Sequence, residues 1–130
     1  AAHSASIASF GAEAERELCA QVAAASGGNP LAGATTLREF LDMTAACNLC
    51  LTNDSGALHV CAATGVRSVT VFGPTDEVGT GPVSPRAQVL REPVDCAPCG
   101  LRECPIDHRC MTRVTVDRVV AAAGMKEPQP

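Results

Sequence analysis

Residues 48–72 read NLCLTNDSGALHVCAATGVRSVTVF, and this stretch decides the fold. Its two ends, residues 48–53 and 67–72, are short apolar runs that predict strands, and the second run is rich in β-branched residues. Residues 57–63 between them predict a short helix that ends at Gly65. A strand, a helix and a second strand in this order form a βαβ unit, so the two strands are expected to be parallel. The sequence therefore predicts an α/β fold, with a Rossmann-like parallel sheet and flanking helices.

Two further helices are expected before this unit. Residues 13–25 are rich in helix-forming residues, and Gly27 follows them as a stop signal. The expected apolar face of this helix consists of Leu18, Val22 and Ala25. The second helix is expected to begin at Thr36, because Glu39 three residues later completes a capping box. Its expected apolar stripe consists of Leu37, Phe40, Leu41 and Ala45.

The chain downstream of the βαβ unit is expected to add one strand and one helix. Residues 73–85 are dense in Gly and Pro and predict a loop. A last short strand is expected over residues 88–92, and a final helix over residues 116–123. Thr115 is the expected N-cap of this helix, and Gly124 ends it.

Length and composition bound the domain organisation and the class of partner. With 130 residues, of which 46% are hydrophobic and 18% charged, the chain suffices for one globular domain. We expect this domain over residues 13–124, after a remnant strand or linker over residues 1–12 and before a tail over residues 125–130. A net charge of −4, with scattered Lys and Arg, argues against a nucleic-acid partner.

Neither a membrane segment nor a targeting segment is expected. No apolar run approaches the roughly 20 residues that a membrane helix needs. The first residues lack the basic region and the continuous apolar region of a signal peptide. The chain does not begin with Met, which suggests that it was cut from a longer protein. The expected compartment is cytoplasmic.

Polar and small residues follow both strands of the βαβ unit, where ligands bind in open parallel sheets. Gly56 lets a ligand approach the backbone, and the hydroxyls of Ser55 and Thr75 can donate to phosphate oxygens. The helix that starts near Ser55 directs free N–H groups and the positive end of its dipole at an anion. His59 lies one helical turn further on. The combination predicts an anion site at the strand ends.

Each of these residues also has an ordinary structural interpretation. Asp54 or Ser55 is expected to cap the following helix in any case. His59 is by itself compatible with a buried structural imidazole, and residues 73–75, Gly-Pro-Thr, with a simple turn.

Residues 51–82 also resemble glycosyltransferase family 9, the ADP-heptose:lipopolysaccharide heptosyltransferases. The resemblance rests on an Asp-(Ser/Thr)-Gly-x-x-His segment over residues 54–59 and on Gly-Pro-Thr over residues 73–75. Upstream, FGAEAERELCAQV (residues 10–22) resembles a Gly…Glu-Arg-Glu stretch of the family. Downstream, CAPCGLRECPIDHRCM (residues 96–111) resembles a Cys-rich segment seen in many members. The similarity spans roughly residues 10–122.

The resemblance implies a specific architecture and donor site. Family members have two Rossmann-like domains in the GT-B arrangement, and this chain resembles the carboxyl-terminal, donor-binding one, incomplete at its amino-terminal edge. The residues implied around the diphosphate and the sugar are Asp54, Ser55, Gly56 and His59. Gly73, Pro74 and Thr75 would form the adjoining wall, and Glu15 would lie near the ribose or base.

The resemblance also implies a reaction and its partners. The donor would be a nucleotide-diphosphate sugar, with ADP-heptose as the leading candidate, and heptose or a related sugar would pass to a lipid-anchored core oligosaccharide of lipopolysaccharide. The full-length enzyme would act at the cytoplasmic face of the inner membrane. If the helix dipole and side-chain donors supply the positive field, transfer needs no metal. The carboxylate that activates the acceptor belongs to the amino-terminal domain, so no catalytic residue is expected in this chain and the chain alone should be inactive.

The eight cysteines form two groups. Cys19, Cys47, Cys50 and Cys61 are expected to be small buried apolar residues. The Cys-rich loop over residues 96–110 contains Cys96, Cys99, Cys104 and Cys110, whose thiolates suit a structural zinc ion or an iron–sulfur cluster. Disulfides and free thiols fit the same spacing, so three interpretations stay open. The alternative function is accordingly a cysteine–metal interaction module on an α/β scaffold, without transferase activity.

Overall fold

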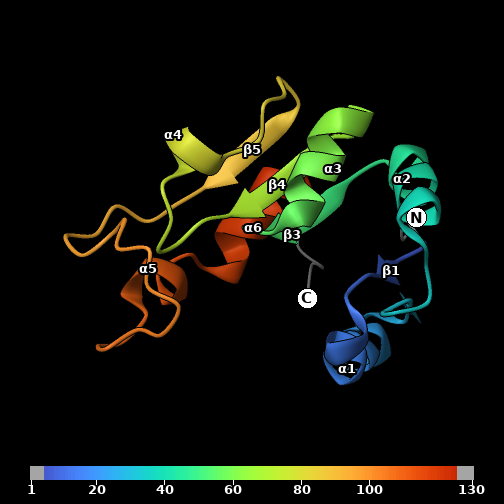
Figure 1. The fold of residues 1–130 in the computed structure, drawn as a ribbon, viewed down its shortest axis with the longest axis horizontal. Coiled ribbons are helices and arrows are strands. Elements are labelled where there is room, and N and C mark those ends of the chain that lie inside the picture. The colour runs from blue at the N-terminus through green and yellow to red at the C-terminus, as the bar shows by residue number, and fades with distance from the viewer. Residues whose placement is uncertain (1–4, 126–130) are drawn as a thin grey trace. The chain divides into compact units, whose positions relative to one another are not determined.

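The computed structural model describes residues 5–125, which form two compact units that divide between Phe40 and Leu41. Figure 1 shows the order of helices and strands along the chain. Residues 1–4, from the predicted remnant strand, and residues 126–130, from the predicted tail, lie outside the described range. Within the described residues, no helix is long and apolar enough to cross a membrane. The single domain predicted over residues 13–124 stays a prediction.

The first unit is built on two very short parallel strands. Strand β1 (Ala8–Ser9) pairs with β2 (Asn29–Pro30), and α1 (Arg16–Ser26) connects them after the 3-10 helix η1 (Glu13–Glu15). The sequence did not predict β2, because two residues that include a proline carry no strand pattern. The rings of Phe10 and Phe40 pack in this unit with centroids 5.1 Å apart.

Helix α1 confirms the predicted helix but not its predicted apolar face. It ends as expected at Gly27, whose positive φ of 70° reverses the chain. Leu18 and Val22 are 59% and 47% exposed, whereas Cys19 and Ala23 are buried. The small residues face the β1–β2 ladder because their short side chains allow the helix to pack closely on it. The predicted face lies one residue away from the buried one.

Helix α2 (Leu37–Ala46) begins with the predicted capping box. The backbone N–H of Thr36 donates to Glu39 Oε1 (3.0 Å), and the N–H of Glu39 donates to Thr36 Oγ1 (3.1 Å). The predicted apolar stripe is only partly correct, because Leu37 and Ala45 are exposed while Thr44 is buried.

The second unit contains the predicted βαβ unit. Strand β3 (Cys50–Asn53), helix α3 (Gly56–Thr64) and strand β4 (Ser68–Val71) follow in order, and the two strands are parallel. Strand β5 (Ala87–Leu90) adds to the other edge of β4, also in parallel, which gives the order β3-β4-β5. The α/β fold with a parallel sheet is thereby confirmed.

Helices pack against this sheet and short helical turns lie beyond its strand ends. Helix α3 contacts β3 and β4, and α6 (Val116–Ala123) contacts β4 and β5 (Figure 1). Thr115 caps α6 as predicted, by accepting from the N–H of Arg118 (3.3 Å). Two single turns, α4 (Glu77–Thr80) and α5 (Arg109–Thr112), lie in segments for which no helix was predicted. Four residues are too few to carry a helical period.

The core of the second unit surrounds the central strand β4. The side chains buried there include Leu58 and Cys61 from α3, Ser68, Val69 and Thr70 from β4, and Phe72. Thr52 of β3 and Thr70 of β4 share a hydrogen bond of 2.8 Å between their hydroxyls. At the other end of the sheet, Arg67 donates to the carbonyls of Ala122 and Ala123 (both 2.8 Å), at the end of α6.

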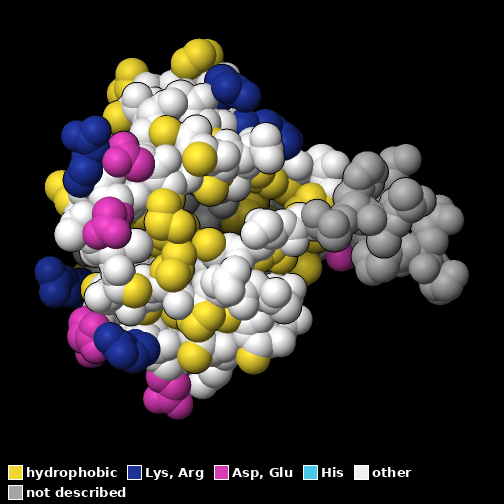
Figure 2. Space-filling model, turned by 90° about the vertical axis from the view of Figure 1, so that its right-hand side faces the viewer, with side chains coloured by type: hydrophobic (Ala, Val, Ile, Leu, Met, Phe, Trp, Pro, Cys, Tyr) yellow, Lys and Arg dark blue, Asp and Glu magenta, His cyan; other side chains and the backbone are white. Residues whose placement is uncertain are grey.

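Figure 2 shows the charged side chains on one face of the molecule. On the face drawn in Figure 2, acidic and basic side chains of the described residues are interspersed among hydrophobic and neutral ones, and no continuous basic stripe is visible.

Candidate ligand site at the strand ends

The site is built at the carboxyl ends of β3 and β4. Asn53 and Val71 are partners in the parallel register, so the loops that follow them leave the sheet at the same edge. Asp54 opens the first loop, and Thr75 lies in the second. The hydroxyl of Thr75 donates to Asp54 Oδ2, which ties the two loops together. The two motifs that the sequence singled out are thus joined by a direct contact.

The start of α3 is left open by the protein's own side chains. Ser55 occupies the N-cap position in an extended conformation, but its hydroxyl makes no capping hydrogen bond. The prediction that Asp54 or Ser55 caps this helix is correct in position only, because Ser55 is the N-cap residue but its hydroxyl makes no capping hydrogen bond, and Asp54 is bonded to Thr75. The first N–H groups of a helix have no partner inside it, so those of Gly56 and Ala57 remain available to an anion, whereas that of Leu58 donates to the carbonyl of Ser55 (3.2 Å). At Gly56, a Cβ would meet no described atom within 4 Å, so the backbone borders open space.

His59 lies one turn after this helix start and is exposed. Its imidazole makes no hydrogen bond to any residue between 5 and 125. The interpretation as a buried structural histidine is therefore wrong. Asp54, Ser55, Gly56 and His59 follow one another as one loop and the first turn of α3, and together with Thr75 they form the surface that we call the mouth.

Glu15 belongs to the first unit and has a structural contact there. It ends η1, and its Oε2 accepts from the N–H of Ala12 (2.7 Å). Its predicted place near the ribose or base stays a prediction.

Gly73 and Pro74 form the base of the second loop, and the Cys-rich segment packs directly on them. Gly73 is buried, and a Cβ at this position would lie 2.3 Å from Met111 Sδ and 3.4 Å from Cys110 Sγ. The N–H of Gly100 donates to the carbonyl of Pro74 (2.7 Å). The Cys-rich segment thus packs against the base of the second loop.

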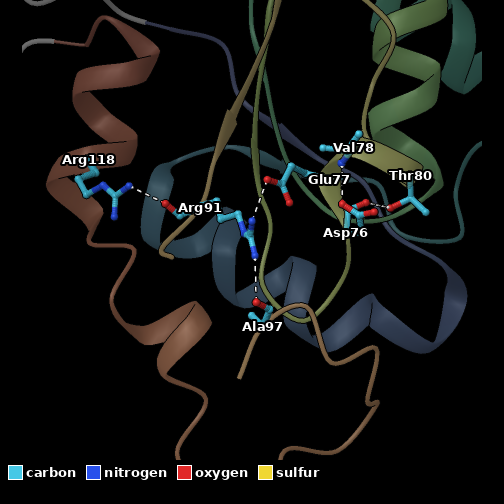
Figure 3. Close-up of polar contacts among 7 residues, drawn as sticks. All are labelled: Asp76, Glu77, Val78, Thr80, Arg91, Ala97 and Arg118. Atoms are coloured by element: carbon cyan, nitrogen blue, oxygen red, sulfur yellow. Dashed lines mark hydrogen bonds and ion pairs between the residues drawn. The ribbon is translucent and has the colours of Figure 1, made fainter. Parts of the chain in front are cut away.

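An ion pair that the sequence did not reveal holds the outer side of this loop (Figure 3). Arg91 Nη1 lies 2.9 Å from Glu77 Oε1, and Arg91 Nη2 donates to the carbonyl of Ala97 (3.3 Å). Asp76 caps α4 by accepting from the N–H of Val78 (3.0 Å). An Asp followed by Glu in a Gly-rich loop is a signal for such a turn. No sequence pattern connects Glu77 with Arg91 fourteen positions later.

The four cysteines of residues 96–110 form no disulfide in the structure, and their environments differ. Cys96 and Cys99 are exposed, Cys104 is half-buried and Cys110 is buried. Burial, together with the neighbouring thiols of Cys96, Cys104 and Cys99, raises the pKa of Cys110. Between residues 5 and 125, no three Cys, His, Asp or Glu side chains are arranged to hold a metal ion. The metal site at these four cysteines stays a prediction.

The other four cysteines only partly match the prediction that they are buried. Cys19 and Cys61 are buried, whereas Cys47 and Cys50 are half-buried. A hydrogen bond with the Cys61 thiol, together with burial, raises the pKa of Cys50.

Comparison with known proteins identifies similar chains. Lipooligosaccharide heptosyltransferase 2 of Campylobacter jejuni is 34% identical over 95 residues, which cover 72% of this chain and 30% of that protein. The structure of the Escherichia coli ADP-heptose LPS heptosyltransferase II superposes with a TM-score of 0.75 and 29% identity, over 92% of this chain and 35% of that one. The chain therefore spans about a third of the length of the proteins that it matches.

A third protein shares the fold at lower sequence identity. The glycosyl transferase family 9 structure from Veillonella parvula has a TM-score of 0.76 and 24% identity, again over 92% of this chain and 35% of that one. Glycosyltransferase family 9 (heptosyltransferase) matches residues 4–109, which include both strand-end loops. With its sequence and its parallel sheet in agreement, the chain belongs to glycosyltransferase family 9.

Proposed function

We propose that this chain is the donor-binding, carboxyl-terminal part of a heptosyltransferase that acts on lipopolysaccharide. The complete protein would transfer a heptose from ADP-heptose to a core acceptor. The observation that carries the proposal is the open start of α3 beside the joined Asp54–Thr75 loops. The heptosyltransferases among its relatives support the choice of sugar and acceptor.

The geometry suits a diphosphate that becomes a leaving group. The N–H groups at Gly56 and Ala57 and the positive end of the α3 dipole would face the phosphates. As the bond to the sugar breaks, ADP gains negative charge, and these fixed donors would stabilise it more strongly than the bound donor. Ser55 would add a hydroxyl donor from the N-cap position. These groups would supply the positive field for departure, so we propose that transfer needs no metal.

The remaining groups of the mouth would orient the sugar. The Asp54 carboxylate has a second oxygen besides the one bonded to Thr75 and could accept from sugar hydroxyls. The exposed imidazole of His59 would contribute a further polar contact. We place activation of the acceptor hydroxyl in the part of the enzyme outside this chain, and the reaction at the cytoplasmic face of the inner membrane.

The test is donor binding by the complete protein, measured by calorimetry with ADP-heptose. Asp54→Ala and His59→Ala should each weaken binding about tenfold or more, since each loses a polar contact to a charged ligand. Asp117→Ala is the matched control, because Asp117 is an exposed acid in the first turn of another helix, α6. Unchanged affinity in both mouth variants would refute the site.

A further inference from the structure

Arg91 and Glu77 form an ion pair that is largely withdrawn from water. Their side chains are only 26% and 25% exposed, and their closest atoms are 2.9 Å apart. Arg91 Nε and Glu77 Oε2 are buried without a partner among the described residues. Burying charges in this way costs desolvation energy that the pairing only partly returns, so such a pair is poor evidence of a stabilising role. The geometry of the pair, in contrast, fixes the relative positions of the segments that it joins.

The pair joins three segments at the strand ends (Figure 3). Arg91 follows the last residue of β5, Glu77 is the first residue of α4, and Ala97 belongs to the Cys-rich segment. The Arg91 backbone is itself held, because Arg118 of α6 donates to its carbonyl (3.0 Å) and pairs with Glu92 (2.6 Å). The Arg91 guanidinium thus contacts the loop from a backbone that Arg118 holds in place.

The ion pair of Arg91 and Glu77 fixes the short loop that contains Thr75. The loop leaves β4 after Val71 and enters α4 at Glu77, so it is held at one end by the sheet and at the other by Arg91. In the middle, the carbonyl of Pro74 accepts from the N–H of Gly100 (2.7 Å). Thr75 follows directly and reaches Asp54. Arg91 therefore holds Glu77, which lies two residues after Thr75, the residue whose hydroxyl joins the two loops.

We propose that Arg91 is a positioning residue of the donor site, which acts through Glu77 and Thr75 on Asp54. It touches neither donor nor acceptor, but it determines where the Asp54 carboxylate stands when the sugar binds. This inference rests on the proposed function, since it assigns Arg91 a role in binding the same donor. If the ion pair were purely structural, its loss would lower the stability of the protein without changing the KM for the donor.

The experiment uses the complete enzyme and separates the Michaelis constants of donor and acceptor. Arg91→Gln should raise the KM for ADP-heptose about tenfold, because a displaced loop misplaces Asp54, and should leave the acceptor KM unchanged. Arg91→Lys keeps the charge opposite Glu77 and should recover part of the loss. If Arg91→Gln does not fold, Glu77→Gln breaks the same pair with an isosteric side chain.

Arg67→Gln is the matched control. Arg67 is a half-buried arginine that also makes two hydrogen bonds, both of 2.8 Å, but at the opposite end of the sheet. Its loss should lower the unfolding temperature without changing the donor KM. An equal rise of the donor KM in Arg67→Gln would overturn the inference, because it would show a general effect of instability.

A double variant tests whether Arg91 acts through Thr75. Thr75→Val removes the hydroxyl that bonds Asp54 and leaves the ion pair in place. If both changes act on the same contact, Arg91→Gln/Thr75→Val should raise the donor KM no more than the worse single variant. Fully multiplicative effects, or a donor KM within twofold of wild type in Arg91→Gln, would overturn the inference. Wild-type enzyme without any donor binding would instead refute the proposed function itself.

Discussion

Gly73 shows how a missing side chain determines the wall of the site. It is buried beneath Met111 and Cys110, and its hydrogen leaves room for their sulfur atoms. The same residue type at Gly56 borders open space. One glycine therefore lets the protein pack on its own backbone, whereas the other leaves its backbone beside open space.

Gly73→Ala should destabilise the protein by about 1–3 kcal/mol, the usual range for overpacking a core. The added methyl would lie 2.3 Å from Met111 Sδ, so Met111 must move. In the double variant Gly73→Ala/Met111→Ala, the penalty of the glycine change should shrink, because the obstructing atom is gone. Urea unfolding measures both, with Gly56→Ala as the control that should leave stability within about 0.5 kcal/mol. Additive losses in the double variant would disprove the clash.

At the scale of elements, sequence patterns were reliable where local chemistry determines the outcome. The capping box of Thr36 and Glu39 and the βαβ unit of residues 48–72 were predicted because their signals lie within a few positions. The buried face of α1 was not, since the unpredicted strand β2 determines which side of the helix packs. Local patterns define an element, but its neighbours decide its orientation.

The capping box of α2 predicts a pH dependence. Hydrogen bonds from the backbone and the hydroxyl of Thr36 lower the pKa of Glu39 below its ordinary value of 4.5. The ionised carboxylate therefore stabilises the folded state above about pH 4.5, and this contribution is lost as the pH falls through the lowered pKa. Glu39→Gln should be less stable than wild type at neutral pH and equal to it in strong acid. A difference in unfolding free energy that does not change with pH would contradict this.

At the scale of the whole molecule, the site depends on contacts between distant parts of the chain. Sequence motifs indicated the mouth, because Asp54 and Thr75 each follow a recognisable strand. The bond between them spans 21 positions, and the pair of Glu77 and Arg91 spans 14. No local pattern predicts either contact. For the same reason the sequence named Asp54 beside Ser55 as a helix cap, although Ser55 holds the N-cap position and the Asp54 carboxylate bonds Thr75.

Hydrogen exchange at the strand ends decides whether the donor binds there. The complete protein is compared with and without saturating ADP-heptose, and with UDP-glucose as the mismatched donor. We predict slower exchange in peptides that cover residues 54–59 and 73–76, strongest with ADP-heptose, because phosphate oxygens would occupy the free N–H groups of α3. Unchanged exchange in both segments, under conditions in which calorimetry shows that the donor is bound, would contradict a donor site at the ends of β3 and β4.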